Sequence, residues 1–138
     1  MRKMGMLAAL VLCAGSAWAV EYSNVDASLQ KALGHGSLKA AQMQDGVLRV
    51  VLTKPELTEL TYYTYVYHDI CAHQWRQPQV FAQWKLQRVE VFNVSTSQGF
   101  AFDARGPVCA DMGQMGQNYR SVIAQRTQAC KAGACPAM

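Results

Sequence analysis

The sequence predicts an α+β fold: a single domain in which a four-stranded, largely antiparallel sheet carries a long helix on one face, followed by an amphipathic C-terminal helix. Three observations point to this class. Residues 53–76 form a long stretch with apolar residues at helical spacing. An Asp-Gly pair at residues 45–46 separates two strand-like runs, and two further runs flank residues 95–99. The predicted order is therefore helix, two strands, helix, two strands and helix.

The first 19 residues have the pattern of a signal peptide that is removed on export. Two basic residues precede an apolar run at 6–13, and an A-W-A motif at 17–19 provides the cleavage site. Cleavage there leaves 20–138 as one disulfide-stabilised domain. Lipoprotein processing at Cys13 is the alternative, but Leu12 stands where a small residue is preferred. No later apolar run reaches the ~20 residues that a bilayer requires, so we expect no transmembrane segment after cleavage and a periplasmic or secreted protein.

The charge of the chain argues against one class of partner, and its cysteine content predicts disulfides. The formal net charge is +4, and removing the two basic residues of the leader lowers it to +2. The remaining basic residues are scattered along the chain, which argues against nucleic acid as a partner. Four cysteines remain after cleavage, an even number in a chain bound for an oxidising compartment, so we expect two disulfides. These cysteines are Cys71, Cys109, Cys130 and Cys135.

The first predicted helix covers residues 24–34, with Asn24 as its N-cap and Gly34 at its end. Residues 38–44 contain two alanines, and either a strand or a helix is consistent with them. Residues 47–53 are the clearer strand, because VLRVVL is almost continuously apolar. The Asp-Gly pair between these two runs favours a hairpin.

The long helix is predicted to begin with a capping box formed by Thr53 and Glu56, with Pro55 in its first turn. A strand is the competing interpretation, because TYYTYVY is rich in aromatic and β-branched residues. The predicted buried face consists of Leu57, Leu60, Tyr63, Tyr67, Ile70 and Cys71.

Residues 77–85 have no clean period and are interpreted as a connection. Strands at 86–94 and 100–105 should form a second hairpin, and a helical stripe from 108 reaches Cys130. Two glycines near the start of that stripe favour a regular helix that begins only at Asn118. The tail after Cys130 is predicted to be a loop.

Candidate chemistry is sparse. His68, Cys71 and His73 invite a metal or thiol interpretation, but on a helix His73 lies about 140° from His68, and a catalytic Cys71 requires a free thiol. Met112 and Met115 have the spacing of thioether copper ligands, which Met138 and His35 could join, yet such methionines usually fill cores. We favour a structural disulfide and core packing, with no metal and no cofactor.

Disulfide pairing follows from helix geometry. Along a continuous final helix, Cys109 and Cys130 would stand about 31 Å apart, far beyond the ~7 Å Cα limit for a disulfide. Of the two other connectivities, we favour Cys71–Cys109 with Cys130–Cys135, because the second pair closes a short ring. That ring, CKAGAC, resembles the protruding cysteine loops of some periplasmic lysozyme inhibitors over these six residues alone, and it lacks their histidine and acidic residue. Such a ring can project as a rigid plug into a partner's cleft.

Together these features predict an exported, non-catalytic binding protein of the cell envelope, an inhibitor or immunity-type partner of another envelope or secreted protein. We do not expect an enzyme. The alternative is an envelope thiol enzyme or metal-binding protein that uses His68, Cys71 and the Met112/Met115 pair.

Overall fold

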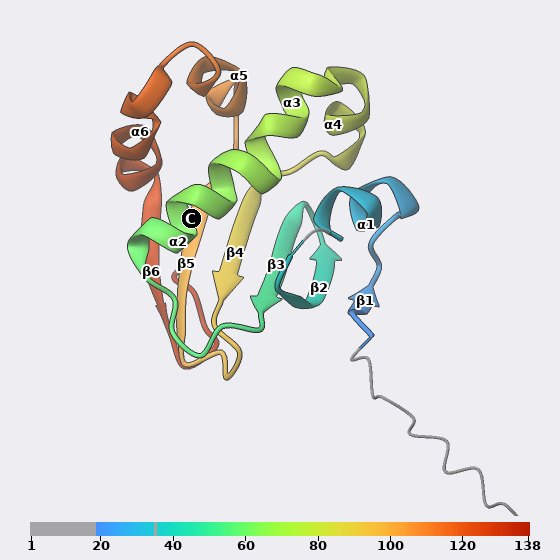
Figure 1. Cartoon of the computed structure of the whole chain (residues 1–138), viewed down its shortest axis with the longest axis vertical. Helices are drawn as coiled ribbons and strands as arrows, with labels where there is room; N and C mark the ends of the chain where they lie inside the picture. The colour runs from blue at the N-terminus through green and yellow to red at the C-terminus, as the bar shows by residue number, and fades with distance from the viewer. Residues whose placement is uncertain (1–18, 35) are drawn as a thin grey trace, which may run out of the picture.

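The computed structural model describes residues 19–34 and 36–138 (Figure 1). The predicted signal peptide, apart from Ala19, lies outside the described residues, as does His35. The fold is of the mixed α+β class, and it has one open sheet of six strands. The predicted class is therefore confirmed, and the predicted strand number of four was wrong.

The strands lie side by side in the order of the sequence. β1–β2 and β3–β4 are parallel pairs, and the other neighbouring pairs are antiparallel. The strands are β1 Glu21–Ser23, β2 Leu38–Gln44, β3 Val47–Leu52, β4 Arg88–Phe92, β5 Gln98–Asp103 and β6 Thr127–Lys131.

The sequence missed the two edge strands, β1 and β6. β1 has only three residues, and β6 reads TQACK, which has neither apolar alternation nor β-branched residues beyond its first position. Both strands depend on pairing with an existing neighbour: β1 with β2, and β6 with β5. Their order comes from the rest of the sheet rather than from local propensity.

The first helix and the first hairpin are present as predicted, but the helix has a different N-cap. α1, Ala27–Leu33, begins after Asp26, whose Oδ1 accepts the Leu29 N–H at 2.8 Å. Asn24 is therefore not the N-cap; its side chain donates to the Met43 carbonyl instead. Residues 38–44 form a strand, and the turn into β3 has positive φ at both central residues, Asp45 (50°) and Gly46 (78°), as a type I′ turn requires.

The long helix is present, but it begins later than predicted. α2, Glu59–Thr64, continues through a π-helical stretch, η1, Tyr65–Cys71, into α3, Ala72–Arg76. Its N-cap is Thr58, whose hydroxyl accepts the Thr61 N–H at 3.1 Å. The predicted capping box at Thr53 and Glu56 was wrong, because residues 53–57 precede the helix as a loop.

The buried face of this helix also differs from the predicted one. Leu60 is 56% exposed, whereas Tyr62, Tyr65 and Val66 are buried. The helix begins five residues later than predicted, and the π-helical turns of η1 contain more residues per turn than the 3.6 that the prediction assumed. Both differences change which side chains face the sheet. Ile70 and Cys71 were placed correctly on the buried side.

Two predictions for the chain beyond residue 76 were wrong. The predicted connection at 77–85 contains α4, Pro78–Trp84, with proline in its first turn. The predicted helix from 108 to 130 is three short pieces followed by β6, because Gly116 takes a positive φ of 56° that interrupts the helix. These pieces are α5 Val108–Met112, η2 Gly116–Asn118 and α6 Tyr119–Gln125. The regular part does begin directly after Asn118.

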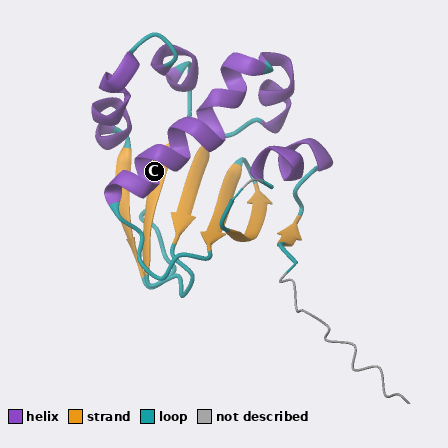
Figure 2. Cartoon of the chain, in the orientation of Figure 1, coloured by secondary structure: helices purple, strands orange, loops and turns teal. Residues whose placement is uncertain are grey.

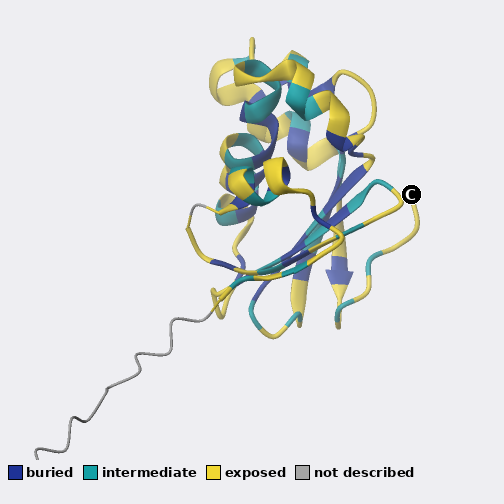
Figure 3. Ribbon diagram, turned by 90° about the vertical axis from the view of Figure 1, so that its right-hand side faces the viewer, coloured by how far each residue is buried: buried dark blue, intermediate teal, exposed yellow. Residues whose placement is uncertain are grey.

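The helices cover one face of the sheet and leave the other face open (Figures 2 and 3). The core lies between the two layers, where the sheet contributes Leu48, Val50, Val89, Val91 and Phe102. Tyr62 joins both layers, since its ring lies 4.8 Å from that of Phe100 and its hydroxyl lies 2.8 Å from Thr127 Oγ1. In the described part of the chain, no helix is long and apolar enough to cross a membrane.

Candidate functional site

The structure joins Cys71 to Cys109 and Cys130 to Cys135, the pairs that the sequence favours. The first disulfide connects η1 to α5 within the helical layer, and both of its cysteines are buried. The second closes a ring at the end of β6. Because Cys71 is part of a disulfide, it has no free thiol in this structure with which to attack a substrate or bind a metal.

The other candidate ligands are not brought together. His68 is exposed with its ring edge-on to Tyr67, and His73 packs against Trp84. Met112 is fully buried in the core, whereas Met138 lies beside the open face of the sheet. Among residues 19–34 and 36–138, no group of three or more His, Cys, Asp or Glu side chains is arranged to hold a metal ion.

The open face of the sheet carries charged and polar side chains from several strands. Strand register aligns the side chains of this face in rows that cross β3, β4 and β5, and two of these rows continue onto β6. The first row contains Val47, Arg88 and Asp103; the second contains Arg49, Glu90, Ala101 and Gln128; the third contains Val51, Phe92, Gly99 and Cys130.

The third row is apolar and is covered by the disulfide ring. Phe92, Ala101 and Cys130 form a small second core, with Val51 and Cys135 packed against it. The ring therefore lies against the sheet rather than projecting as a free plug. Its turn is closed by two backbone hydrogen bonds between Lys131 and Ala134, at 2.9 and 3.0 Å.

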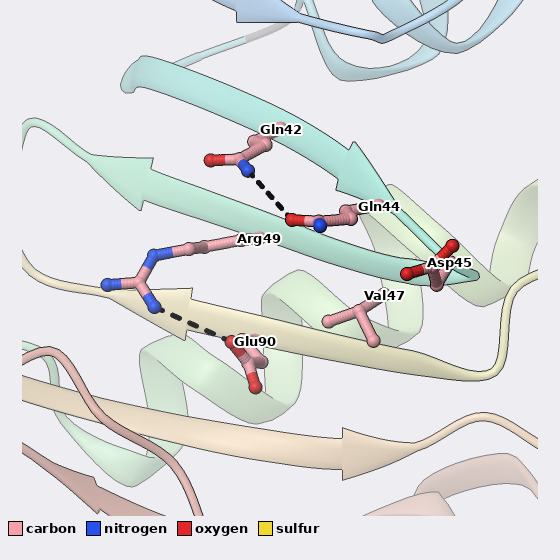
Figure 4. Close-up of a pocket in the computed structure, with 6 residues that line it drawn as sticks. All are labelled: Gln42, Gln44, Asp45, Val47, Arg49 and Glu90. Atoms are coloured by element: carbon pink, nitrogen blue, oxygen red, sulfur yellow. Dashed lines mark hydrogen bonds and ion pairs between the residues drawn. The ribbon is translucent and has the colours of Figure 1, made fainter.

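The second row carries a charged group beside a shallow hollow (Figure 4). Glu90 lies 3.6 Å from Arg49 on the neighbouring strand and 3.1 Å from Arg88 on its own strand. The Arg49 guanidinium also lies 4.1 Å from the centre of the Phe92 ring, which adds a cation–π contact. The hollow has a volume of about 420 Å³, and Gln42, Gln44, Asp45 and Val47 complete its lining.

A second hollow of about 320 Å³ lies over the first row, between β4, β5 and β6. Arg105 donates to both carboxylate oxygens of Asp103, each at 2.9 Å, and Arg126 lies 3.4 Å from one of them. The hydrogen bonds from Arg105, and then the nearby charge of Arg126, lower the pKa of Asp103 to about 2. This carboxylate therefore stays ionised at any physiological pH.

The charged groups of the open face are mostly paired with one another. Glu90 and Asp103 are each held by arginines, so neither is a free general base. Guanidinium and amide groups provide charge and directional hydrogen bonds for a polar partner.

Sequence reasoning missed this face. A signal was present in the alternation Arg88-Val89-Glu90-Val91, which is typical of a strand with one polar side. The alternation does not show which side the helices leave uncovered, and it does not show that Arg49 stands opposite Glu90. Both depend on strand register and layer packing.

Comparison with known proteins finds no matching protein family, no similar curated protein and no similar solved structure. Any conclusion about function therefore depends on the geometry of this chain.

Proposed function

We propose that this protein is an exported, non-catalytic binding protein of the cell envelope, an inhibitor or immunity-type partner of another envelope or secreted protein. The open face of the sheet is its binding surface. The observation that supports this proposal is the uncovered sheet face itself, on which Arg49, Glu90 and Arg88 form a cross-strand charged group beside two hollows.

Location outside the cytoplasm is supported by the predicted leader at residues 1–19 and by two disulfides, which persist mainly in oxidising compartments. The same disulfides favour a rigid scaffold. A surface built on paired strands loses little conformational entropy on binding, which suits an inhibitor that must bind in one orientation.

The proposal is tested by photo-crosslinking from the two sides of the molecule. A photoreactive amino acid replaces Gln42, which is exposed on the open face, and in a matched control it replaces Gln79, which is exposed on α4 in the helical layer. Each protein is irradiated in envelope extract of the source organism. We expect one discrete cross-linked species from position 42, reduced by excess unmodified protein, and none from position 79.

Two results would contradict the proposal. Absence of any product from position 42 would argue against a protein partner on the open face. Equal products from both positions would show that contact with other proteins does not depend on this face.

A further inference from the structure

Arg88 is buried on the face of the sheet that the helices leave open. The residue is only 5% exposed, although it lines the second hollow. Its Nε lies 3.1 Å from Glu90 Oε2, but the pair is not aligned as a hydrogen bond, and its Nη2 is buried with no hydrogen-bond partner among the described residues. A guanidinium is always charged, and leaving its donors buried and unpaired is unfavourable.

The nearest acidic partner across the strands is already used. Asp103 stands directly opposite Arg88 in the β4–β5 register, yet its carboxylate accepts three hydrogen bonds from Arg105, one from the backbone N–H and two from the guanidinium. Arg126 is fixed as well, because it donates to the backbone carbonyls of Asp103 and Arg105 at 2.8 and 2.7 Å. The second hollow is thus lined by three arginines and one acidic side chain, and the buried donors without a hydrogen-bond partner belong to Arg88.

We infer that the second hollow is a binding site for a carboxylate, supplied by an Asp or Glu side chain of the protein partner and held by Arg88. An arginine fork matches the two oxygens of a carboxylate, and such charge-assisted hydrogen bonds are among the strongest in proteins. The volume of about 320 Å³ is at the small end of ligand pockets and suits one inserted side chain. The site follows from the geometry alone, whereas the source of the carboxylate rests on the proposed function.

The test is an NMR titration of the isotope-labelled protein with two short peptides. One is acetyl-Gly-Glu-Gly-amide, and the matched control replaces its glutamate by glutamine. We expect the glutamate peptide to shift the Arg88 Nε–Hε resonance to saturation, with smaller shifts in the amides of β5 and β6, and the glutamine peptide to leave them in place. Equal shifts from the two peptides, or no saturable shift, would overturn the inference.

Variants locate the site. Arg88→Gln should weaken binding of the glutamate peptide about tenfold or more, because it removes the charged donors. Arg120→Gln removes an arginine that is exposed on α6 outside the hollow, and it should leave binding unchanged. Gln128→Glu places a carboxylate within the same hollow, and it should abolish peptide binding while raising the melting temperature. This third variant keeps the test valid if Arg88→Gln fails to fold.

The source of the carboxylate is tested separately from the site. If acetate binds as tightly as the glutamate peptide, and cross-linking from position 42 is unchanged in Arg88→Gln, then no partner side chain occupies the hollow and that part of the inference fails. The proposed function would stand in that case. Loss of the cross-link in Arg88→Gln, with the fold intact, would support a carboxylate from the partner.

Discussion

Replacing Gly99 by alanine should destabilise the open face because a side chain there has no room. Gly99 pairs with Phe92 on one side and Cys130 on the other. A Cβ atom on Gly99 would lie 2.5 Å from Phe92 Cδ1 and 3.0 Å from the Val91 carbonyl oxygen. The Phe92 ring is 0% exposed and has the Arg49 guanidinium against it, so it cannot simply move away. An aromatic ring lying over a strand glycine is a known stabilising pair.

Two effects of the substitution oppose each other. Alanine restricts the unfolded chain and favours the strand by about 0.5–1 kcal/mol over glycine. Overpacking costs about 1–3 kcal/mol, and expelling the Phe92 ring instead would forfeit about 1.5–3 kcal/mol of burial. The steric cost is larger, so we expect Gly99→Ala to lower the free energy of unfolding by about 1–2 kcal/mol.

Urea unfolding followed by circular dichroism measures this change. Phe92→Leu provides the control, since the shorter side chain leaves room for a Cβ at position 99. The double variant should therefore lose less stability than the sum of the two single variants, by about 1 kcal/mol. Additive losses, or a Gly99→Ala protein as stable as the parent, would refute the steric argument.

Three further predictions concern stability. Ala132→Asn should stabilise the ring by about 0.5 kcal/mol, because Ala132 has a φ of 50° in the turn and Asn tolerates that region; a lower melting temperature would contradict this. The pKa of Asp103 is lowered in the folded protein, so its carboxylate stabilises the fold by about 1 kcal/mol after screening above pH ~4, and this contribution is lost as the pH falls toward about 2. The free energy of unfolding of Asp103→Asn should therefore fall less steeply over that range than that of the parent. Parallel stability curves for the two proteins would exclude the effect. Cys71→Ala opens a 38-residue loop and should cost about 4 kcal/mol, against about 2 kcal/mol for Cys135→Ala; equal losses, or peptide mapping that links Cys71 to another cysteine, would overturn the assignment.

The elements that sequence could predict are those with strong local signals. The Asp45-Gly46 turn takes positive φ at both residues, and the stretch before residue 76 has apolar side chains at helical spacing. The boundaries were less certain, because Thr53 and Thr58 are both good N-caps and only packing selects Thr58. β6 could not be predicted, since TQACK becomes a strand only when β5 offers an edge to pair with.

The open face that we propose for binding could not be predicted from the sequence for a different reason. Arg88 reads as an ordinary polar position of an alternating strand, and nothing local distinguishes it from an exposed arginine. Its burial follows from the residues that surround it on three strands and from the tail at Met138, which lines the same hollow. Asp103, its natural partner, is taken by Arg105, which lies only two residues further along the chain. Buried guanidinium donors without a hydrogen-bond partner become visible only in the folded molecule.

The two disulfides stabilise different parts of the fold. Cys71–Cys109 lies within the helical layer, where it closes the longer loop and contributes to the stability of the whole fold. Cys130–Cys135 lies on the open face, where its ring covers Phe92 and borders the row that contains Arg49 and Glu90. Opening the short ring should therefore expose Phe92 and loosen the arginine above it, with a smaller effect on global unfolding than the loss of Cys71–Cys109. On this argument the second disulfide chiefly holds the shape of the face that we propose for binding.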